Sequence, residues 1–438
     1  MKSSESVQYD VLVLGSGPAG FYSALSCGRN GLKTALVERD IQGGTGLATG
    51  CLPVKMILDR IKLLRETGVP ERLPQVLNDS RERMNHLGPL MNRRLMSAGV
   101  DLYTGEGFFL SADSFKVDDT ILSARSIILA TGTEPGSLPG VSDHPNCISH
   151  KEAVSLSRPP GSLTIVGGDV EGIEFASLFS ELGTSVTVLE QQSEILTGYD
   201  RDLVQPIADR LKDNGVSFKM DTRVTGSGEK GELLTDSQSI NPSGPVLITG
   251  IRRPSFPEGL AAAGVECLKD RIPVNGSLRT NVPHIFAVGD INGLLGMGSA
   301  AVQQGMQMGD FLKDNIPITL DQGGLPRAVF SLPEIAGAGQ QEKDLIAAGI
   351  PYGSGQFPFN HTWRGMGKWE TGFVKVLVTD KDRLAGLWMS GQTVSETAGF
   401  CGPVLDAGIG LSSLRKSLMI HPVLGEAVLE ACNQIHWE

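Results

Sequence analysis

The chain has 438 residues, enough for about three domains of ordinary size, and 40% of them are hydrophobic, which suffices for large buried cores. Its 49 acidic against 38 basic residues give a formal net charge of −11, which excludes a nucleic-acid backbone as an expected partner. The N-terminus lacks the apolar core of a signal peptide, no apolar run reaches the ~18 residues of a membrane span, and the six cysteines lack C-x-x-C spacing, so we expect a cytoplasmic protein with reduced thiols and no metal.

A dinucleotide-binding pattern opens the chain. The apolar run 11–14 predicts a buried strand, and a G-x-G-x-x-G turn follows it and begins a helix. A second apolar run, 34–37, ends at Glu38, at the spacing of a carboxylate that binds a ribose hydroxyl. Strand, turn, helix, strand and acid in this order indicate a Rossmann-type fold. The glycines of the turn are Gly15, Gly17 and Gly20.

A glycine-rich segment with one cysteine follows at residues 43–55. Gly44 and Thr45 suit close approach of the backbone to a phosphate. Cys51 and Lys55 are four residues apart, so they share one face if the segment is helical. The chain after Lys55 reads as helical to about Met96, and its many arginines predict a solvated face, with a partner-docking surface as the alternative.

A second dinucleotide pattern begins after the proline pair at 159–160, which marks a domain boundary. The apolar run 163–166 leads into a glycine turn, Gly167 to Gly172, and a helix, and a second strand at 185–189 precedes Glu190. Two Rossmann-like units are therefore predicted in one chain.

Segment 43–55 resembles the redox-active helix of the flavoprotein disulfide reductases, most closely that of lipoamide dehydrogenases. That helix reads G-G-T-C-x-x-x-x-C-x-P-x-K. Cys51 matches its second cysteine, and Gly46 stands where the first would be. The resemblance covers the chain from Val11 to about Ala431, so we ask what such an enzyme does with half of its disulfide.

The resemblance implies the fold and the assembly. We expect an α/β protein with two Rossmann-like dinucleotide-binding domains and a C-terminal α+β interface domain that forms a homodimer. It implies non-covalently bound FAD. The expected segments are an FAD-binding domain at 1–157 and 276–322, an NAD(P)-binding-like domain at 158–275, and an interface domain at 323–438.

Further positions match the family's flavin motifs. Gly107 matches a position near the flavin adenine, and Asp290 matches the aspartate that binds the ribityl chain. Lys55 would pair with Glu174 beside the flavin, as the matching residues do in the family. The remaining matches are Thr131 and Gly132 in the A-T-G strand and Gly298 at the start of a helix over the pyrophosphate.

The C-terminal segment resembles the family's H-P-T-x-x-E motif, with Val423 in place of the threonine. A lone histidine near a terminus is usually structural. With Glu426 at family spacing and Cys51 elsewhere, we interpret His421 and Glu426 as the acid-base pair, which serves the flavin site of the other subunit. The resemblance also implies that Cys51 is the flavin-side thiol. We expect its position at a helix N-terminus and Lys55 to favour the thiolate.

The second glycine turn departs from the family's G-G-G-x-x-G, because Asp169 replaces its third glycine. A charge at ~4 Å from a phosphate costs about 4 kcal/mol at an effective dielectric near 20. Glu171 adds a second acid to the same turn, so we expect weak NAD(H) binding. Glu190 would favour NAD over NADP if any dinucleotide binds.

Three functions stay open. The first is an FAD-dependent oxidoreductase of the dihydrolipoamide dehydrogenase type that acts on a thiol, disulfide or persulfide through Cys51, with His421 and Glu426 as acid and base. The second is an FAD flavoprotein with a protein or another non-NAD electron partner. The third is a non-catalytic flavoprotein subunit of a complex.

Overall fold

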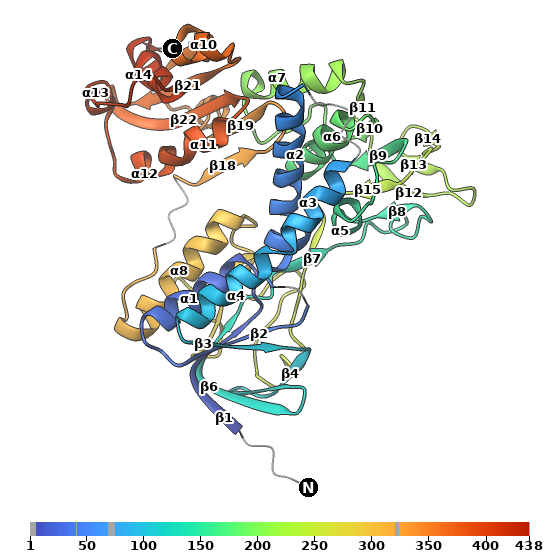
Figure 1. The fold of residues 1–438 in the computed structure, drawn as a ribbon, viewed down its shortest axis with the longest axis vertical. Helices are drawn as coiled ribbons and strands as arrows, with labels where there is room; N and C mark the ends of the chain where they lie inside the picture. The colour runs from blue at the N-terminus through green and yellow to red at the C-terminus, as the bar shows by residue number, and fades with distance from the viewer. Residues whose placement is uncertain (1–5, 41, 69–74, 320–323, 438) are drawn as a thin grey trace.

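The structure is a computed structural model that describes residues 6–40, 42–68, 75–319 and 324–437. Three large sheets follow one another along the chain, and the C-terminal sheet lies at the far end of the molecule from the N-terminus (Figure 1). The predicted α/β fold class is confirmed. Among the described residues, no helix combines the length and the apolar character needed to cross a bilayer.

The first sheet has seven strands. Six of them have the order β3-β2-β1-β6-β5-β4, and the seventh, β17, pairs with the C-terminal part of β6 on the edge away from β1. Strand β17 returns from late in the chain and extends the parallel part of this sheet. Helices α1 and α8 pack closely together against the sheet. The bounds are β1 Ser6–Leu14, α1 Pro18–Arg29, β2 Thr34–Glu38, β3 Val100–Thr104, β4 Gly107–Ser111, β5 Ser114–Val117, β6 Thr120–Leu129, β17 Ile285–Ala287 and α8 Gly298–Asp314.

The second sheet has five parallel strands in the order β11-β10-β9-β15-β8. A small antiparallel sheet, β12-β13-β14, lies beyond it, and β7 pairs with β16. The bounds are β7 Thr133–Pro135, β8 Cys147–Ile148, α5 His150–Val154, β9 Ser162–Val166, α6 Val170–Glu181, β10 Ser185–Leu189, α7 Arg201–Asp213, β11 Ser217–Lys219, β12 Val224–Ser227, β13 Leu233–Thr235, β14 Ser239–Ile240, β15 Val246–Ile248 and β16 Arg252–Pro254.

The third sheet is antiparallel and has the order β18-β19-β22-β21-β20-β23. Short helices cover its outer face (Figure 1). The bounds are β18 Pro326–Val329, β19 Glu334–Gly339, α9 Glu342–Ala348, β20 Gly353–Pro358, α10 Trp363–Lys368, β21 Gly372–Thr379, β22 Arg383–Gly391, α11 Val394–Thr397, α12 Cys401–Asp406, α13 Leu411–Leu414, α14 Ala427–Asn433 and β23 His436–Trp437.

The stretch from Lys55 to about Met96 is mostly helical, as expected, but it is divided. Three helices occupy this stretch, α2 Cys51–Glu66, α3 Val76–Met84 and α4 Leu87–Ser97, and residues 69–74 lie outside the described part. Helix α2 ends near Gly68, which has a φ of +69° that favours glycine. Helix α2 also packs against α6, so it joins the first unit to the second.

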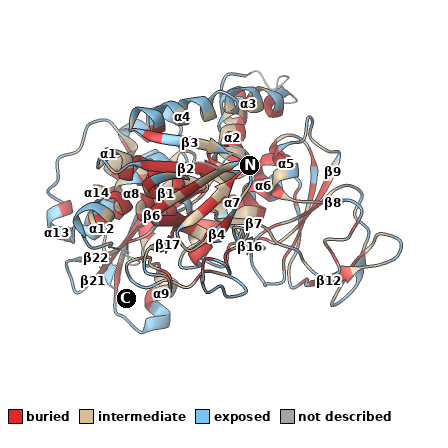
Figure 2. Cartoon of the chain, turned by 90° about the horizontal axis from the view of Figure 1, so that it is seen from below, coloured by how far each residue is buried: buried red, intermediate tan, exposed pale blue. Residues whose placement is uncertain are grey.

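The core follows the apolar strands that the sequence predicts. All five residues of β2 are buried, as parallel strands covered on both faces should be, and the central strands form a buried band in Figure 2. The first glycine turn, the second glycine turn and the start of α2 all meet at the carboxyl ends of these strands, where ligands bind in open α/β sheets.

Candidate active site

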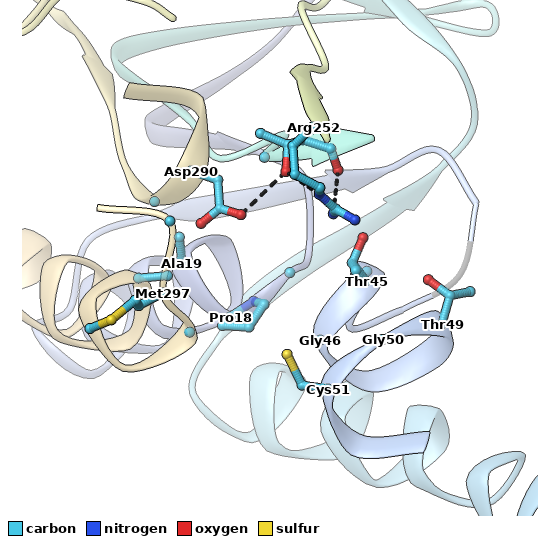
Figure 3. A pocket seen from close by; sticks show the side chains of 18 of the residues that line it. Pro18, Ala19, Thr45, Gly46, Thr49, Gly50, Cys51, Arg252, Asp290 and Met297 are labelled. Carbon is cyan, nitrogen blue, oxygen red and sulfur yellow. Dashed lines mark hydrogen bonds between the residues drawn. The ribbon is translucent and has the colours of Figure 1, made fainter. Parts of the chain in front are cut away.

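A large cavity of about 1900 Å³ opens at the carboxyl ends of the first two sheets. A typical small-molecule pocket has ~300–1000 Å³, so this cavity can hold a dinucleotide cofactor together with a second ligand. Figure 3 shows Cys51 at one wall, with Pro18 and Asp290 across from it. The predicted residues that line it are Gly15, Gly17, Glu38, Gly44, Thr45, Cys51, Lys55, Gly107, Thr131, Gly132, Glu174, Asp290 and Gly298.

The glycines of the first turn have separate tasks. Gly15 has a φ of +97°, and a Cβ there would lie 2.6 Å from the carbonyl oxygen of Ala130. A Cβ on Gly20 would lie 1.9 Å from the carbonyl oxygen of Gly15, so Gly20 lets α1 pack on the strand and does not line the cavity. A Cβ on Gly17 would meet no atom within 4 Å, so this backbone stays open to a phosphate at the N-terminus of α1.

Glu38 is fixed at the end of β2. Its Oε2 accepts hydrogen bonds from Ser16 N at 2.7 Å and Ser16 Oγ at 2.6 Å, and its Oε1 accepts one from Asp40 N at 2.9 Å. The side chain is buried but still borders the cavity. The carboxylate is therefore held where a ribose would meet it.

One buried polar atom at the cavity wall lacks a partner. Among the described residues, Thr131 Oγ1 is buried without any hydrogen-bond partner, which is a cost unless a ligand satisfies it. Its neighbour Gly132 has a φ of +63° and open space where a Cβ would be. An unsatisfied hydroxyl beside exposed backbone fits a bound polar cofactor along this wall.

Asp290 lies in the turn after β17 and accepts a hydrogen bond from Thr133 Oγ1 at 3.3 Å. Burial raises the pKa of Asp290, and the nearby Arg252 opposes that shift. Arg252 donates to Thr133 Oγ1 at 3.1 Å and contacts both ring nitrogens of His150 at 3.2 Å. Figure 3 shows Arg252 and Asp290 on the same side of the cavity.

Sequence reasoning missed Arg252, Thr133 and His150. All three line the cavity. Arg252 begins β16, four residues after β15 ends at Ile248. Thr133 begins β7, directly after the A-T-G segment. Polar residues just after a parallel strand are the signal that could have found them.

Cys51 is the first residue of α2, directly after a five-residue π-helical turn, Thr45–Thr49. Lys55 lies one turn later, and its Nζ is 2.5 Å from Glu174 Oε2 of α6. Glu174 Oε1 also accepts a hydrogen bond from Phe330 N at 3.0 Å, and Lys55 lies over the Phe330 ring. The predicted Lys55–Glu174 pair is confirmed by this contact, and it is anchored by three segments of the chain.

The expectation that the Cys51 thiolate is favoured is wrong, because the surroundings of Cys51 raise the pKa of its thiol. The side chain is exposed within the cavity, yet the surrounding walls limit its hydration, and this desolvation raises its pKa. Lys55 lowers the pKa by a smaller amount, because the Lys55 charge is shared with Glu174, which itself raises the pKa. All six cysteines are free, as expected.

Gly46 replaces the first cysteine of the family motif and lies inside the π-helical turn. A Cβ at this position would lie 2.8 Å from Cγ of Pro18, the first residue of α1. The glycine therefore lets the turn approach α1 more closely than any residue with a side chain could. Cys51 is left without a neighbouring thiol.

The two acids of the second glycine turn have different surroundings. Glu171 Oε2 accepts a hydrogen bond from Gly250 N at 2.7 Å, and Glu171 Oε1 lies 3.5 Å from His150 Nδ1. These contacts fix the position of Glu171, which lines the cavity together with Asp169, so both acids of the turn border it as the sequence predicts. Asp169 is exposed at the N-terminus of α6, where solvent weakens its repulsion to about 1 kcal/mol per contact.

Glu190 occupies the second sheet's counterpart of the Glu38 position. Its carboxylate accepts hydrogen bonds from Gly168 N at 2.5 Å and Gln192 N at 2.8 Å. It is buried and lies outside the residues that line the cavity. Its present contacts stabilise the turn, as those of Glu38 do in the first sheet.

His421 and Glu426 form a hydrogen-bonded pair but do not line the cavity. His421 Nδ1 is 2.8 Å from Glu426 Oε1, and Glu426 Oε2 accepts a hydrogen bond from Val423 N at 3.0 Å. The hydrogen bond to His421 lowers the pKa of Glu426. The His421 side chain is 53% exposed, so one chain does not bring it to its own Cys51.

Two family profiles match nearly the whole chain. The profile described as "Pyridine nucleotide-disulphide oxidoreductase" matches residues 9–305. The chain belongs to this family. The dimerisation domain of pyridine nucleotide-disulphide oxidoreductases matches residues 325–432, which supports a homodimer.

Curated relatives agree with the family. A dihydrolipoamide dehydrogenase of Chaetomium thermophilum is 30% identical over 96% of this chain and 90% of its own length. A dihydrolipoyl dehydrogenase of Bacillus subtilis is 29% identical over 97% of each chain. The solved HOCl-induced flavoprotein disulfide reductase RclA of Escherichia coli superposes with a TM-score of 0.87 at 25% identity, covering 97% of this chain and 99% of its own.

Members of this pyridine nucleotide-disulphide oxidoreductase family are FAD-dependent oxidoreductases that use NAD(H), and the first turn fits FAD. The open backbone at Gly17, the fixed carboxylate of Glu38 and the unpaired Thr131 hydroxyl suit the polar groups of a dinucleotide. The second turn fits NAD(H) less well, since the carboxylate of Asp169 lines the cavity at this turn.

Proposed function

We propose that this protein is an FAD-dependent oxidoreductase of a thiol, disulfide or persulfide, with an active site shared between two subunits. Cys51 of one subunit would supply the reactive sulfur, and His421 with Glu426 of the other would transfer the proton. The observation that carries the proposal is the 2.8 Å contact between His421 Nδ1 and Glu426 Oε1, because a carboxylate that holds Nδ1 of a half-exposed imidazole orients that ring for proton transfer.

The chain's own residues suggest how the site works. Gly17, Glu38, Thr131 and Asp290 would hold FAD, which supplies a two-electron acceptor or donor when bound. Cys51 would exchange with a substrate disulfide RSSR, so that a Cys51–SR bond forms, the S–S bond breaks and RS⁻ leaves. His421 would protonate that thiolate, while Glu426 orients the imidazole through Nδ1. A second thiol then releases Cys51.

The substrate class follows from the relatives. Two similar proteins are named dihydrolipoamide and dihydrolipoyl dehydrogenases, so a lipoyl-type dithiol is the first substrate to test. A dithiol suits a single-cysteine site. Its first thiol would form a mixed disulfide with Cys51, with bound FAD as the two-electron acceptor and His421 as the proton acceptor. Its second thiol would then attack that disulfide, so that Cys51 is released as a thiol and the substrate leaves as a cyclic disulfide. A protein that carries such a group is an equally suitable donor.

Anaerobic stopped-flow absorbance of the FAD-loaded protein tests the proposal. Dihydrolipoamide should bleach the flavin in the native protein, and Cys51→Ser should abolish the bleaching. His421→Gln should slow it by about 10²–10⁴-fold, the usual contribution of a general acid or base. Equal rates in the native protein and Cys51→Ser would refute the single-thiol reaction.

One observation favours a second candidate, an FAD flavoprotein whose electron partner is not NAD(H). Asp169 is exposed at the second turn, where a pyrophosphate would approach the N-terminus of α6. NADH in place of dihydrolipoamide in the same experiment separates the two. Bleaching by the thiol without bleaching by NADH would favour the second candidate.

A further inference from the structure

An exposed tryptophan lies against the proton-transfer pair. The Trp363 ring centroid is 5.2 Å from that of His421, and the two planes are 69° apart. Trp363 is 73% exposed, although a tryptophan normally hides most of its surface. The site described above uses His421 and Glu426 but gives this indole no task.

The position of Trp363 is fixed by the start of α10. Thr362 caps this helix, and its Oγ1 accepts a hydrogen bond from Gly365 N at 2.9 Å and donates one to Phe359 O at 2.8 Å. Thr362 and Phe359 are both buried. The indole is thus presented outward from a rigid base, as a preformed binding surface requires.

Two further apolar side chains near Trp363 or His421 in the chain are exposed. Met366 lies one turn after Trp363 on α10 and is 53% exposed. Ile420, directly before His421, is 79% exposed. Trp363, Met366 and Ile420 are thus exposed apolar side chains of the domain that the family uses for dimerisation, and Trp363 contacts the histidine ring.

We propose that Trp363 is a specificity-determining residue, whose indole holds the carbon skeleton of the substrate while its sulfur meets the partner subunit's Cys51. This inference rests on the proposed function. It assigns the substrate to disulfides and thiols that carry a planar or apolar group beside the sulfur. A small hydrophilic disulfide has nothing to place on the indole and gains nothing from it.

The test measures thiol–disulfide exchange at Cys51 in the FAD-loaded protein with two probes, 4,4′-dithiodipyridine and bis(2-hydroxyethyl) disulfide. In each case Cys51–SR forms, the probe's S–S bond breaks, and one equivalent of thiol leaves. Cys51→Ser sets the background from the other thiols. Trp363→Ala should slow the aromatic probe by about 2- to 10-fold, the size of an aromatic contact, and leave the hydroxyethyl probe unchanged.

Trp369→Ala is the matched control, because Trp369 follows the same helix, is 88% exposed and has no ring contact with His421. It should change neither rate, and Trp363→Phe should retain most of the preference. An equal change for both probes in Trp363→Ala, or no change at all, would overturn the inference. If Cys51 reacts with neither probe in the native protein, the proposed function fails first.

Discussion

Residue 46 is glycine, and a side chain at this position would clash with the ring of Pro18. The contact is close, 2.8 Å from an ideal Cβ to Pro18 Cγ, so a larger residue requires the turn or α1 to move. This one residue decides that Cys51 acts without a neighbouring thiol. It also sets what a restored cysteine would meet.

Gly46→Cys should still bridge to Cys51 on oxidation, because the remaining helix matches the family spacing. Before oxidation, the added side chain should lower the free energy of unfolding by about 1–3 kcal/mol, as overpacking does. Thiol titration and thermal unfolding measure the two effects. Retention of both thiols after oxidation, or a native Cys51 already bridged within the chain, would contradict the account.

Asp169→Gly removes the exposed charge from the second turn. We expect NADH to bind about tenfold more tightly, since one or two exposed contacts are worth about 1–2 kcal/mol. Glu229→Gln is the control and should change little, because Glu229 is an exposed acid that does not line the cavity. The measurement is anaerobic flavin bleaching against NADH concentration, and fast bleaching of the native protein at micromolar NADH would overturn this reading.

Helix α5 begins with the buried residue His150, and the fold disfavours its protonated form. Burial lowers the pKa of His150 to about 4, and Arg252 adds to the shift. Glu171 at 3.5 Å would favour the protonated ring, but burial and Arg252 outweigh it. The unfolded chain has the usual pKa near 6.5, so protonation favours unfolding.

The free energy of unfolding should therefore fall as the pH drops from about 6.5 towards 4. The loss from His150 should reach up to roughly 3 kcal/mol, and the contribution is fully present above pH 6.5. Chemical denaturation at several pH values measures it against His150→Gln. A variant with the same pH dependence as the native protein would show that other groups dominate.

Strand β21 is tied to the start of α7 by a buried lysine. Lys375 Nζ lies 3.0 Å from Asp200, 2.9 Å from Asp202 and 2.7 Å from Glu342. Burial alone would lower the Lys375 pKa, but the hydrogen bonds to Glu342 and Asp202 outweigh it and raise the pKa. The cluster joins the second unit to the C-terminal sheet.

Lys375→Met should lower the free energy of unfolding by about 3–5 kcal/mol, because it leaves the buried carboxylate of Asp200 and the partly exposed ones of Asp202 and Glu342 without their counter-ion. Lys416→Met, at an exposed position, should have almost no effect and controls for the loss of a charge. Urea unfolding compares the two. Equal stability of both variants would show that the cluster does not hold the units together.

For the whole molecule, the apolar strands and their glycine turns were predictable, because strand, turn and acid recur locally at fixed spacing, as at Gly17 and Glu38. The pairing of Lys55 with Glu174 followed from the resemblance and is observed. The contacts of Glu171 were not predictable, since its partners Gly250 and His150 come from other segments. For the same reason Arg252 and the suppressed Cys51 thiolate emerged only in three dimensions.

The proposed active site needs two chains. His421 lies outside the cavity that contains Cys51 of the same chain, so a shared site needs the two-fold dimer. Light scattering at micromolar concentration should therefore show a dimer, and a monomer would count against the shared site. The dimer alone does not assign the roles, which requires variants of both residues in one molecule.

The most direct measurement combines Cys51→Ser in one subunit with His421→Gln in the other, using two affinity tags to isolate the heterodimer. Each parent homodimer should bleach its flavin slowly or not at all with anaerobic dihydrolipoamide. The heterodimer contains one site with both native residues, so it should regain fast bleaching at one of its two flavins. A heterodimer as inactive as both parents would contradict a site shared between subunits.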